Sequence, residues 1–198
     1  MRVPTQSYTD EIEIKRSRFI GIGRYIDQKE ERKPIIDTLR REHPQANHVV
    51  HAAIIGRTGE FLSASDDREP KNTAGRPVLE VLKGSGLTNI IVCVVRYFGG
   101  TLLGTGGLVK AYTEAAHLVV NNIASEELVD TATFSFSIPY EHYDRVSMYL
   151  KEYQREIECS FLSDVTLTLT CEKSVEDMVK EHLINLTNGT VSPYRDVQ

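Results

Sequence analysis

The sequence contains few cysteines, no long apolar run and no leader-like start, and each absence argues against a class of protein. The three cysteines are an odd number without paired spacing, so we expect no disulfide framework. The longest purely apolar run, 90–95, is far too short to span a bilayer. The first residues lack the apolar stretch of a signal peptide. We therefore expect a cytoplasmic protein without a membrane segment.

What is present is an ordinary globular composition, with 40% hydrophobic and 26% charged residues. The length of 198 residues allows one large domain or two small ones. The net charge of −5 is unevenly distributed: residues 1–130 contain 17 basic and 17 acidic groups, whereas residues 131–198 contain 6 and 11. A polyanion such as RNA would be repelled by the last third and tolerated by the first part.

The first part alternates predicted strands and helices. The pattern predicts strands over 11–22, 48–55 and 89–98, a return strand beginning within 59–62, and helices over 27–42, 78–83 and 108–122. The strand over 89–98 should be covered on both faces because its apolar run is uninterrupted. Asp27 and Glu30 are expected to form a capping box, although Pro34 interrupts the helix that follows.

The last third predicts a separate domain. The pattern indicates strands over 131–138, 157–161, 165–171 and 190–197, with helices over 141–153 and from 174 onward. A three-residue loop should pair Phe161 with Val165, Cys159 with Leu167 and Ile157 with Leu169, which places the large apolar side chains on one face. The resulting β-α-β-β-α-β order predicts an α+β, ferredoxin-like domain over 131–198. The first domain would then be 1–130.

A glycine-rich segment, 99–107, lies between a predicted buried strand and a predicted helix. It contains Gly99, Gly100, Gly104, Gly106 and Gly107. One interpretation is a cradle for a phosphate or an RNA backbone, formed by free amides at a helix start. The other is a tight turn packed against a neighbouring loop. It is not a Walker loop, because Leu108 and Val109 stand where Lys and Ser/Thr are required.

Arg96, Tyr97 and Phe98 end the predicted buried strand and also allow two interpretations. The cation could contact phosphate while the two aromatic rings stack on bases, as in single-strand binding sites. Alternatively, Arg96 pairs with a carboxylate of an acidic loop, which we favour because an arginine that leaves a buried strand needs a partner. That loop offers Asp66, Asp67 and Glu69.

The same acidic loop could hold a divalent cation, but no further ligand pattern supports this. We expect the three carboxylates to form loop caps and ion pairs instead. His48 and His51 are three residues apart on a predicted strand, so they point to opposite faces and cannot share a metal. We predict no metal site, no cofactor and no catalytic group.

At this point the motifs resemble the signature of the Impact/YigZ family. One motif reads VRYFGG at 95–100 and continues as LGTGGLVKAY at 103–112; a companion motif reads SDD, EP and TAGRP within 65–77. IKRSRF at 14–19 and the strand histidine His48 also fit. The resemblance covers nearly the whole chain, and the two-domain arrangement is similar to that of bacterial members. Arg68 and Asn72 stand where the family usually has glycine.

The resemblance implies a fold for each domain. The first would have the fold of the second domain of a small-subunit ribosomal protein, shared with domain IV of elongation factor G. The second would be similar to the C-terminal domain of that factor. Eukaryotic relatives act in translational control, so the resemblance implies contact with the ribosome, RNA or a translation-related protein.

We therefore expect a non-enzymatic regulator that contacts the translation machinery, RNA or a protein partner through its first domain. Its contact surface would combine the glycine-rich segment with Arg76, Arg96 and Lys110. The alternative is a small-molecule enzyme in which the glycine-rich segment holds a phosphate, although the chain offers no clear base for it. A third possibility is a module that binds only protein.

Overall fold

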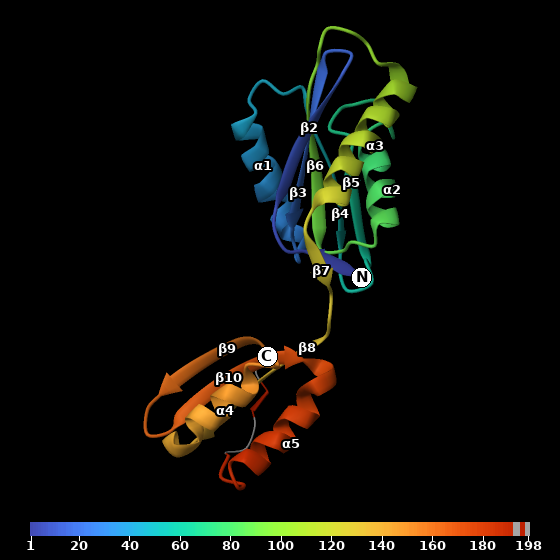
Figure 1. The fold of residues 1–198 in the computed structure, drawn as a ribbon. Helices are drawn as coiled ribbons and strands as arrows, with labels where there is room; N and C mark the ends of the chain where they lie inside the picture. The colour runs from blue at the N-terminus through green and yellow to red at the C-terminus, as the bar shows by residue number, and fades with distance from the viewer. Residues whose placement is uncertain (192–194, 197–198) are drawn as a thin grey trace. The chain divides into compact units, whose positions relative to one another are not determined.

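The computed structural model describes residues 1–191 and 195–196 of a mixed α/β protein with two domains. The chain divides into two compact units, Met1–Leu128 and Val129–Gln198. Each unit has its own sheet and its own hydrophobic core (Figure 1). No helix in the described part of the chain is long and apolar enough to cross a membrane.

The first unit is built on a five-stranded antiparallel sheet in the order β2-β3-β6-β4-β5. Its strands are β2 (Tyr8–Ile14), β3 (Ser17–Tyr25), β4 (His48–Ile55), β5 (Phe61–Ser65) and β6 (Ile90–Tyr97). The central strand β6 is buried from Ile90 to Arg96, as its apolar run predicts. A short ribbon pairs β1 (Arg2–Pro4) with β7 (Ser125–Glu127).

Helices cover both faces of this sheet (Figure 1). They are α1 (Arg32–Glu42) on one face, preceded by the 3-10 turn η1 (Lys29–Glu31), and α2 (Gly75–Ser85) and α3 (Gly104–Asn122) on the other. Helix α3 approaches β3 closely because β3 contains Gly21 and Gly23. A Cβ at Gly21 would lie 2.8 Å from the carbonyl oxygen of Ala115, and one at Gly23 would lie 2.5 Å from Val119. The glycines therefore allow the helix to pack against the strand.

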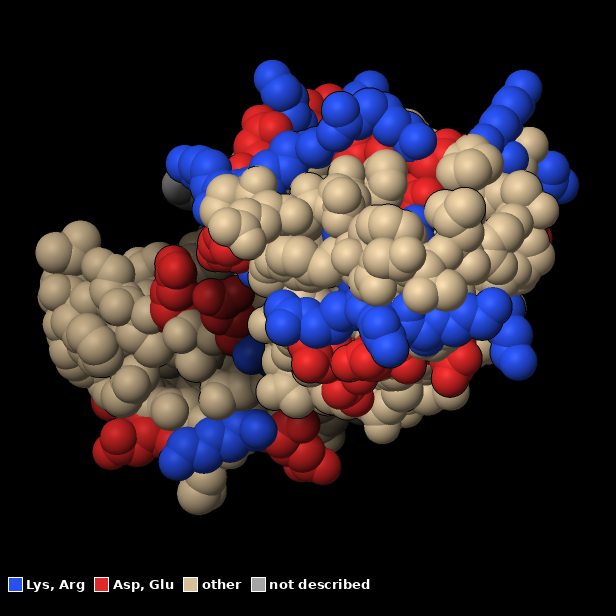
Figure 2. All heavy atoms as spheres, turned by 90° about the horizontal axis from the view of Figure 1, so that it is seen from above, with Lys and Arg blue, Asp and Glu red and all other residues tan. Residues whose placement is uncertain are grey.

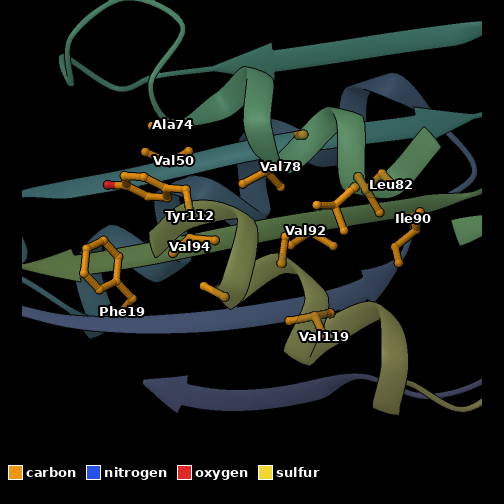
Figure 3. Packing of buried hydrophobic residues seen from close by; sticks show 14 of the residues in the cluster. Phe19, Val50, Ala74, Val78, Leu82, Ile90, Val92, Val94, Tyr112 and Val119 are labelled. Atoms are coloured by element: carbon orange, nitrogen blue, oxygen red, sulfur yellow. The ribbon is translucent and has the colours of Figure 1, made fainter. Parts of the chain in front are cut away.

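The core between the sheet and helices α2 and α3 is apolar along most of its length (Figure 3). Phe19 and Tyr112 lie side by side at one end of it, with ring centroids 5.2 Å apart in an edge-to-face arrangement. Tyr112 is fully buried although it carries a hydroxyl. The polar end of its side chain therefore needs a partner inside the protein.

The strand predicted over 11–22 is in fact a hairpin of β2 and β3. Its turn consists of Lys15 and Arg16, whose φ angles are 48° and 64°. Two successive left-handed residues form the tight turn that suits twisted hairpins, but the usual sequence signal is asparagine, aspartate or glycine. No local sequence pattern therefore indicated this turn.

Three helix starts also differ from prediction. The carboxylate of Glu31, not Glu30, accepts the N–H groups of Asp27 and Gln28, at 3.0 and 2.9 Å, and Pro34 is harmless in the first turn of α1. Helix α2 begins at Gly75 rather than Val78. Helix α3 begins at Gly104, so the last glycines of the glycine-rich segment form its first turn rather than a preceding loop.

The second unit has the predicted β-α-β-β-α-β order. It comprises β8 (Thr131–Ile138), η2 (Tyr140–His142), α4 (Tyr143–Leu150), β9 (Gln154–Phe161), β10 (Val165–Glu172), η3 (Lys173–Val175), α5 (Glu176–Leu186) and β11 (Arg195–Asp196). The sheet is antiparallel in the order β11-β8-β10-β9, and α4 and α5 pack on one face. The final strand was predicted over 190–197; residues 192–194 and 197 of that range lie outside the described residues.

The hairpin of β9 and β10 has the predicted register, with Phe161 opposite Val165 and Cys159 opposite Leu167. Phe161 lies on the predicted apolar face, opposite Val165, yet its side chain is 53% exposed. Strand β9 lies at the edge of the sheet, so Phe161 is covered only in part, by Tyr143 at 5.2 Å between ring centroids.

Candidate functional site

One end of the five-stranded sheet gathers most of the residues singled out in the sequence. The register places Arg18 opposite Tyr97, and His48 opposite Arg96. The turn at 15–16 and the loops 43–47, 66–74 and 98–103 therefore meet at this end, which we call the loop end (top of Figure 1). Helices α2 and α3 both begin there.

A buried polar cluster lies beneath the loop end. The Arg96 guanidinium, 6% exposed as a residue, donates from Nη1 to Glu69 Oε1 at 2.6 Å. The Tyr112 hydroxyl donates to the same oxygen at 2.7 Å, and His48 Nε2 lies 3.7 Å from it. Burial, together with the Glu69 carboxylate, raises the pKa of Tyr112 well above its ordinary value.

The ion pair predicted for Arg96 is thus present, and it changes the role of this residue. Its guanidinium carbon lies 5.4 Å from the ring centroid of Phe19 and 5.7 Å from that of Phe98. An arginine held by a carboxylate and two rings is not a free surface cation. Arg96 therefore organises the loop end from below, and its expected place on the contact surface was wrong.

The other two acidic residues have separate structural roles. Asp66 accepts the backbone N–H groups of Asn72, Ala74 and Gly75 at 2.8, 3.1 and 2.8 Å, which fixes the start of α2. Asp67 accepts the N–H of Val49 and a bond from Arg40, both at 2.6 Å. The three carboxylates thus bind different partners instead of converging on one point.

Arg68 and Asn72 adopt left-handed backbone conformations, with φ angles of 69° and 64°. Only glycine takes this region at no steric cost, although asparagine tolerates it better than most residues. Glycine would adopt both conformations without strain. The Arg68 side chain is exposed, so the strained residue adds a cation to the surface.

Tyr97 and Gly99 are occupied by contacts within the domain. The Tyr97 hydroxyl is hydrogen-bonded to His43 Nδ1 at 2.8 Å, and Arg18 lies over its ring at 4.9 Å. A Cβ at Gly99 would lie 2.0 Å from the carbonyl of Arg16, and its N–H donates to Ser17 Oγ at 3.1 Å. The interpretation of a turn packed against a neighbouring loop therefore applies at Gly99.

The remaining glycines of the segment differ in what they require. Gly100 and Gly104 have φ angles of 81° and 72°, which favour glycine. A Cβ at Gly107 would meet Leu103 at 3.1 Å. Gly106 has neither constraint: its φ is not left-handed, and no atom lies within 4 Å of the position of its Cβ. Because Gly106 has no side chain, the first turn of α3 is left uncovered at this position.

Several exposed cations lie on the segments that meet at the loop end. Those for which the described residues provide no carboxylate partner are Lys15, Arg16, Arg68, Lys71, Arg76 and Lys110. Figure 2 views the loop end from above and shows Lys and Arg atoms in two rows on either side of a strip of uncharged residues. Leu102, 83% exposed, and Phe98, 45% exposed, also lie on the 98–103 loop.

The sequence identified Arg76 and Lys110 but missed Lys15, Arg16 and Lys71. These three residues are distant in sequence from the glycine-rich segment. Only the register of the sheet brings their loops to the same end of the sheet as that segment. Lys15 and Arg16 belong to the IKRSRF motif, which was the one available signal.

Comparison with known proteins gives matches over most of the chain. The model of the Impact N-terminal domain matches residues 15–120, and a domain of unknown function, DUF1949, matches residues 136–190. An IMPACT family member from Haemophilus influenzae is 38% identical over 90% of this chain and 89% of its own. The IMPACT family member YigZ from Escherichia coli is 39% identical over 70% of this chain and 69% of its own.

A solved structure matches both units. A crystal structure described as that of a hypothetical protein is 30% identical to this chain, with a TM-score of 0.69. The match covers 100% of this chain and 97% of the other. The fold of the whole chain is therefore similar to that of a protein solved by crystallography.

Proposed function

The chain belongs to the IMPACT family, and from that premise we propose that it is a non-enzymatic regulator that contacts the translation machinery by binding RNA at its loop end. The observation that carries the proposal is the group of unpaired cations around the uncovered first turn of α3. The translational role follows the resemblance to eukaryotic relatives, and the cytoplasm is the compartment we propose for it.

Lysines and arginines supply the sequence-independent part of RNA binding by replacing counterions at phosphates. Here Lys15, Arg16, Lys71 and Lys110 supply such groups from three different segments of the loop end. A polyanion lying across this end would contact several of them at once. The buried Arg96 supports the surface from below, through Glu69.

The first turn of α3 adds backbone donors to these charges. Leu103, at the N-cap, provides no side-chain hydrogen bond to the amides of this turn. Free amides at a helix start attract anions, and the open space at Gly106 would let a phosphate approach them. Phe98, which is half exposed, offers a ring on which an unpaired base would stack.

We also infer the fold names from the topology. The strand order β11-β8-β10-β9 in a β-α-β-β-α-β chain supports a ferredoxin-like second domain. The first domain, over 1–128 and close to the expected 1–130, is inferred to share the fold of the ribosomal-protein second domain and of elongation factor G domain IV. Both names rest on analogy of arrangement.

The proposal is tested by RNA binding of the full chain. The measurement is fluorescence anisotropy with a labelled single-stranded RNA. An RNA of about 20 nucleotides is longer than the usual single-strand binding site. We expect the double variant Lys71→Glu/Lys110→Glu to weaken binding by about tenfold or more, and to lower the salt dependence, because two phosphate contacts are lost.

The matched control changes charge elsewhere. Lys151→Glu reverses an exposed cation of the second domain, and Arg155→Glu reverses a second one whose pair with Glu172 is exposed, so the double variant equals the charge change. If these reversals weaken RNA binding as much as the loop-end pair, binding responds to net charge and the proposed surface is wrong. An enzyme that holds a nucleotide phosphate would instead show a rise in Tm with ATP or GTP.

A further inference from the structure

The outer surfaces of α2 and α3 enclose a groove that the proposed RNA contact does not use. Its volume is about 580 Å³, and its lining alternates apolar and polar side chains. Pro77 and Val81 contribute from α2, and Val109, Thr113 and Val120 from α3. On α2 the lining extends from Arg76 to Ser85, which is about 14 Å at the rise of an α-helix. The groove is therefore elongated rather than round.

One glycine opens this surface although the fold does not require it. Gly84 lines the groove, its φ is not left-handed, and no neighbouring atom lies within 4 Å of the position of its Cβ. Gly106 has the same conformational freedom, but it lies outside the lining and belongs to the proposed RNA contact. Every other glycine in the described part of the chain has a left-handed φ or a neighbour within 4 Å of its Cβ position.

Glycine inside a helix is unfavourable compared with alanine, so Gly84 carries a cost that packing within the domain does not repay. At this position glycine provides room for another backbone to approach closely. An elongated apolar groove between two helices is the kind of surface into which an amphipathic helix inserts its apolar side chains.

The charges beside the groove indicate the chemistry of the occupant. Glu80, the one carboxylate in the lining, is paired with Lys83 at 3.1 Å. Arg76, also in the lining, is exposed and has no carboxylate partner among the described residues. The unbalanced charge of the lining is therefore positive. We propose that this groove binds an acidic amphipathic α-helix of a partner protein, at a site separate from the RNA contact.

The test uses the full chain and defined peptides. The probe is a labelled helical peptide with leucines at i, i+3, i+4 and i+7 and glutamates on its remaining surface; the control peptide is a scrambled isomer of equal composition. We expect anisotropy to show binding of the patterned peptide and at least tenfold weaker binding of the scrambled one.

The decisive variant is Gly84→Leu, which fills the groove without meeting any atom of the domain at its Cβ. It should weaken peptide binding by about tenfold or more, whereas Tm stays the same or rises because leucine favours a helix. RNA binding should be unchanged, since Gly84 lies nine residues, about 14 Å, along α2 from the loop end at which this helix begins. Loss of peptide binding with a stable fold supports the groove.

A charge exchange tests the second half of the proposal. Arg76→Glu should weaken binding of the glutamate peptide and restore affinity for a version with lysines in place of glutamates. The proposal is overturned if the patterned and scrambled peptides bind equally or not at all, or if Gly84→Leu leaves binding intact. It is also overturned if RNA displaces the patterned peptide from the wild-type protein, because the two ligands would then share one site.

Discussion

The two domains stabilise themselves in different ways. The first places a buried cluster of Arg96, Glu69 and Tyr112 at the end of its sheet and carries helix glycines that its packing does not require. The second packs two helices on a sheet through an apolar core, and its buried charged residue, Glu176, is paired with Lys173 and Lys180. Polar burial and unneeded glycines both cost stability, so the first domain is where the structure points to function.

The largest expected effect tests whether the second domain depends only on its apolar core. Phe134→Ala should lower its free energy of unfolding by about 4 kcal/mol, because the ring is fully buried between the sheet and helices. Urea unfolding should then show early loss of the second domain with the first unchanged. A common shift of both transitions would mean that the two cores do not unfold separately.

The next effect concerns the buried cluster of the first domain. Arg96→Ala should cost about 3 kcal/mol, because it leaves the Glu69 carboxylate buried without its cation. The matched control in the second domain is Arg155→Ala, whose exposed pair with Glu172 at 3.2 Å should contribute at most about 1 kcal/mol. Equal Tm changes for the two variants would contradict the contrast between the domains.

The next variant should stabilise the first domain instead of destabilising it. Gly106→Ala should raise the stability of the first domain by about 1 kcal/mol, since alanine favours the helix and meets no atom there. The same variant should weaken RNA binding, because the new methyl group covers the first turn of α3. Denaturant unfolding and anisotropy on one preparation measure both; a variant that is stabilised and binds fully would remove Gly106 from the proposed contact.

The smallest expected effect is a difference between the two domains in how stability depends on pH. Burial, reinforced by Arg32, lowers the pKa of His51 below its ordinary value of 6.5. Unfolded His51 then binds a proton at higher pH than the folded residue, so this contribution to stability is full above about pH 6.5 and declines as the pH falls. Hydrogen bonds from Lys173 and Lys180 lower the pKa of Glu176, so its contribution declines only below its ordinary value of 4.5.

Lowering the pH from 7 to 5 should therefore destabilise the first domain more than the second through these two groups. Denaturant unfolding at each pH measures the difference. His51→Gln should reduce the slope in the first domain and leave the second unchanged. An unchanged slope would assign the acid sensitivity to other groups.

Much of the secondary structure could be predicted because its signals are local. The alternation along β10 determined its inner face and its register with β9, and the uninterrupted run in β6 indicated a strand covered on both sides. The hairpin at Lys15 and Arg16 was missed because neither residue type is usual in a left-handed turn. The pairing of Arg96 was predicted from the cost of burying a charge, but the sequence left three carboxylates as equal candidates.

The sequence by itself thus determined the family resemblance, the charge division and most of the elements, since all of these depend on neighbouring residues. Only the tertiary structure decided that Glu69 is the partner of Arg96, and that Asp66 and Asp67 are engaged elsewhere. It also decided that Lys15 and Lys71 lie at the same end as the glycine-rich segment. Antiparallel pairing across five strands brings distant loops together at one edge of the sheet, and no local pattern records that register.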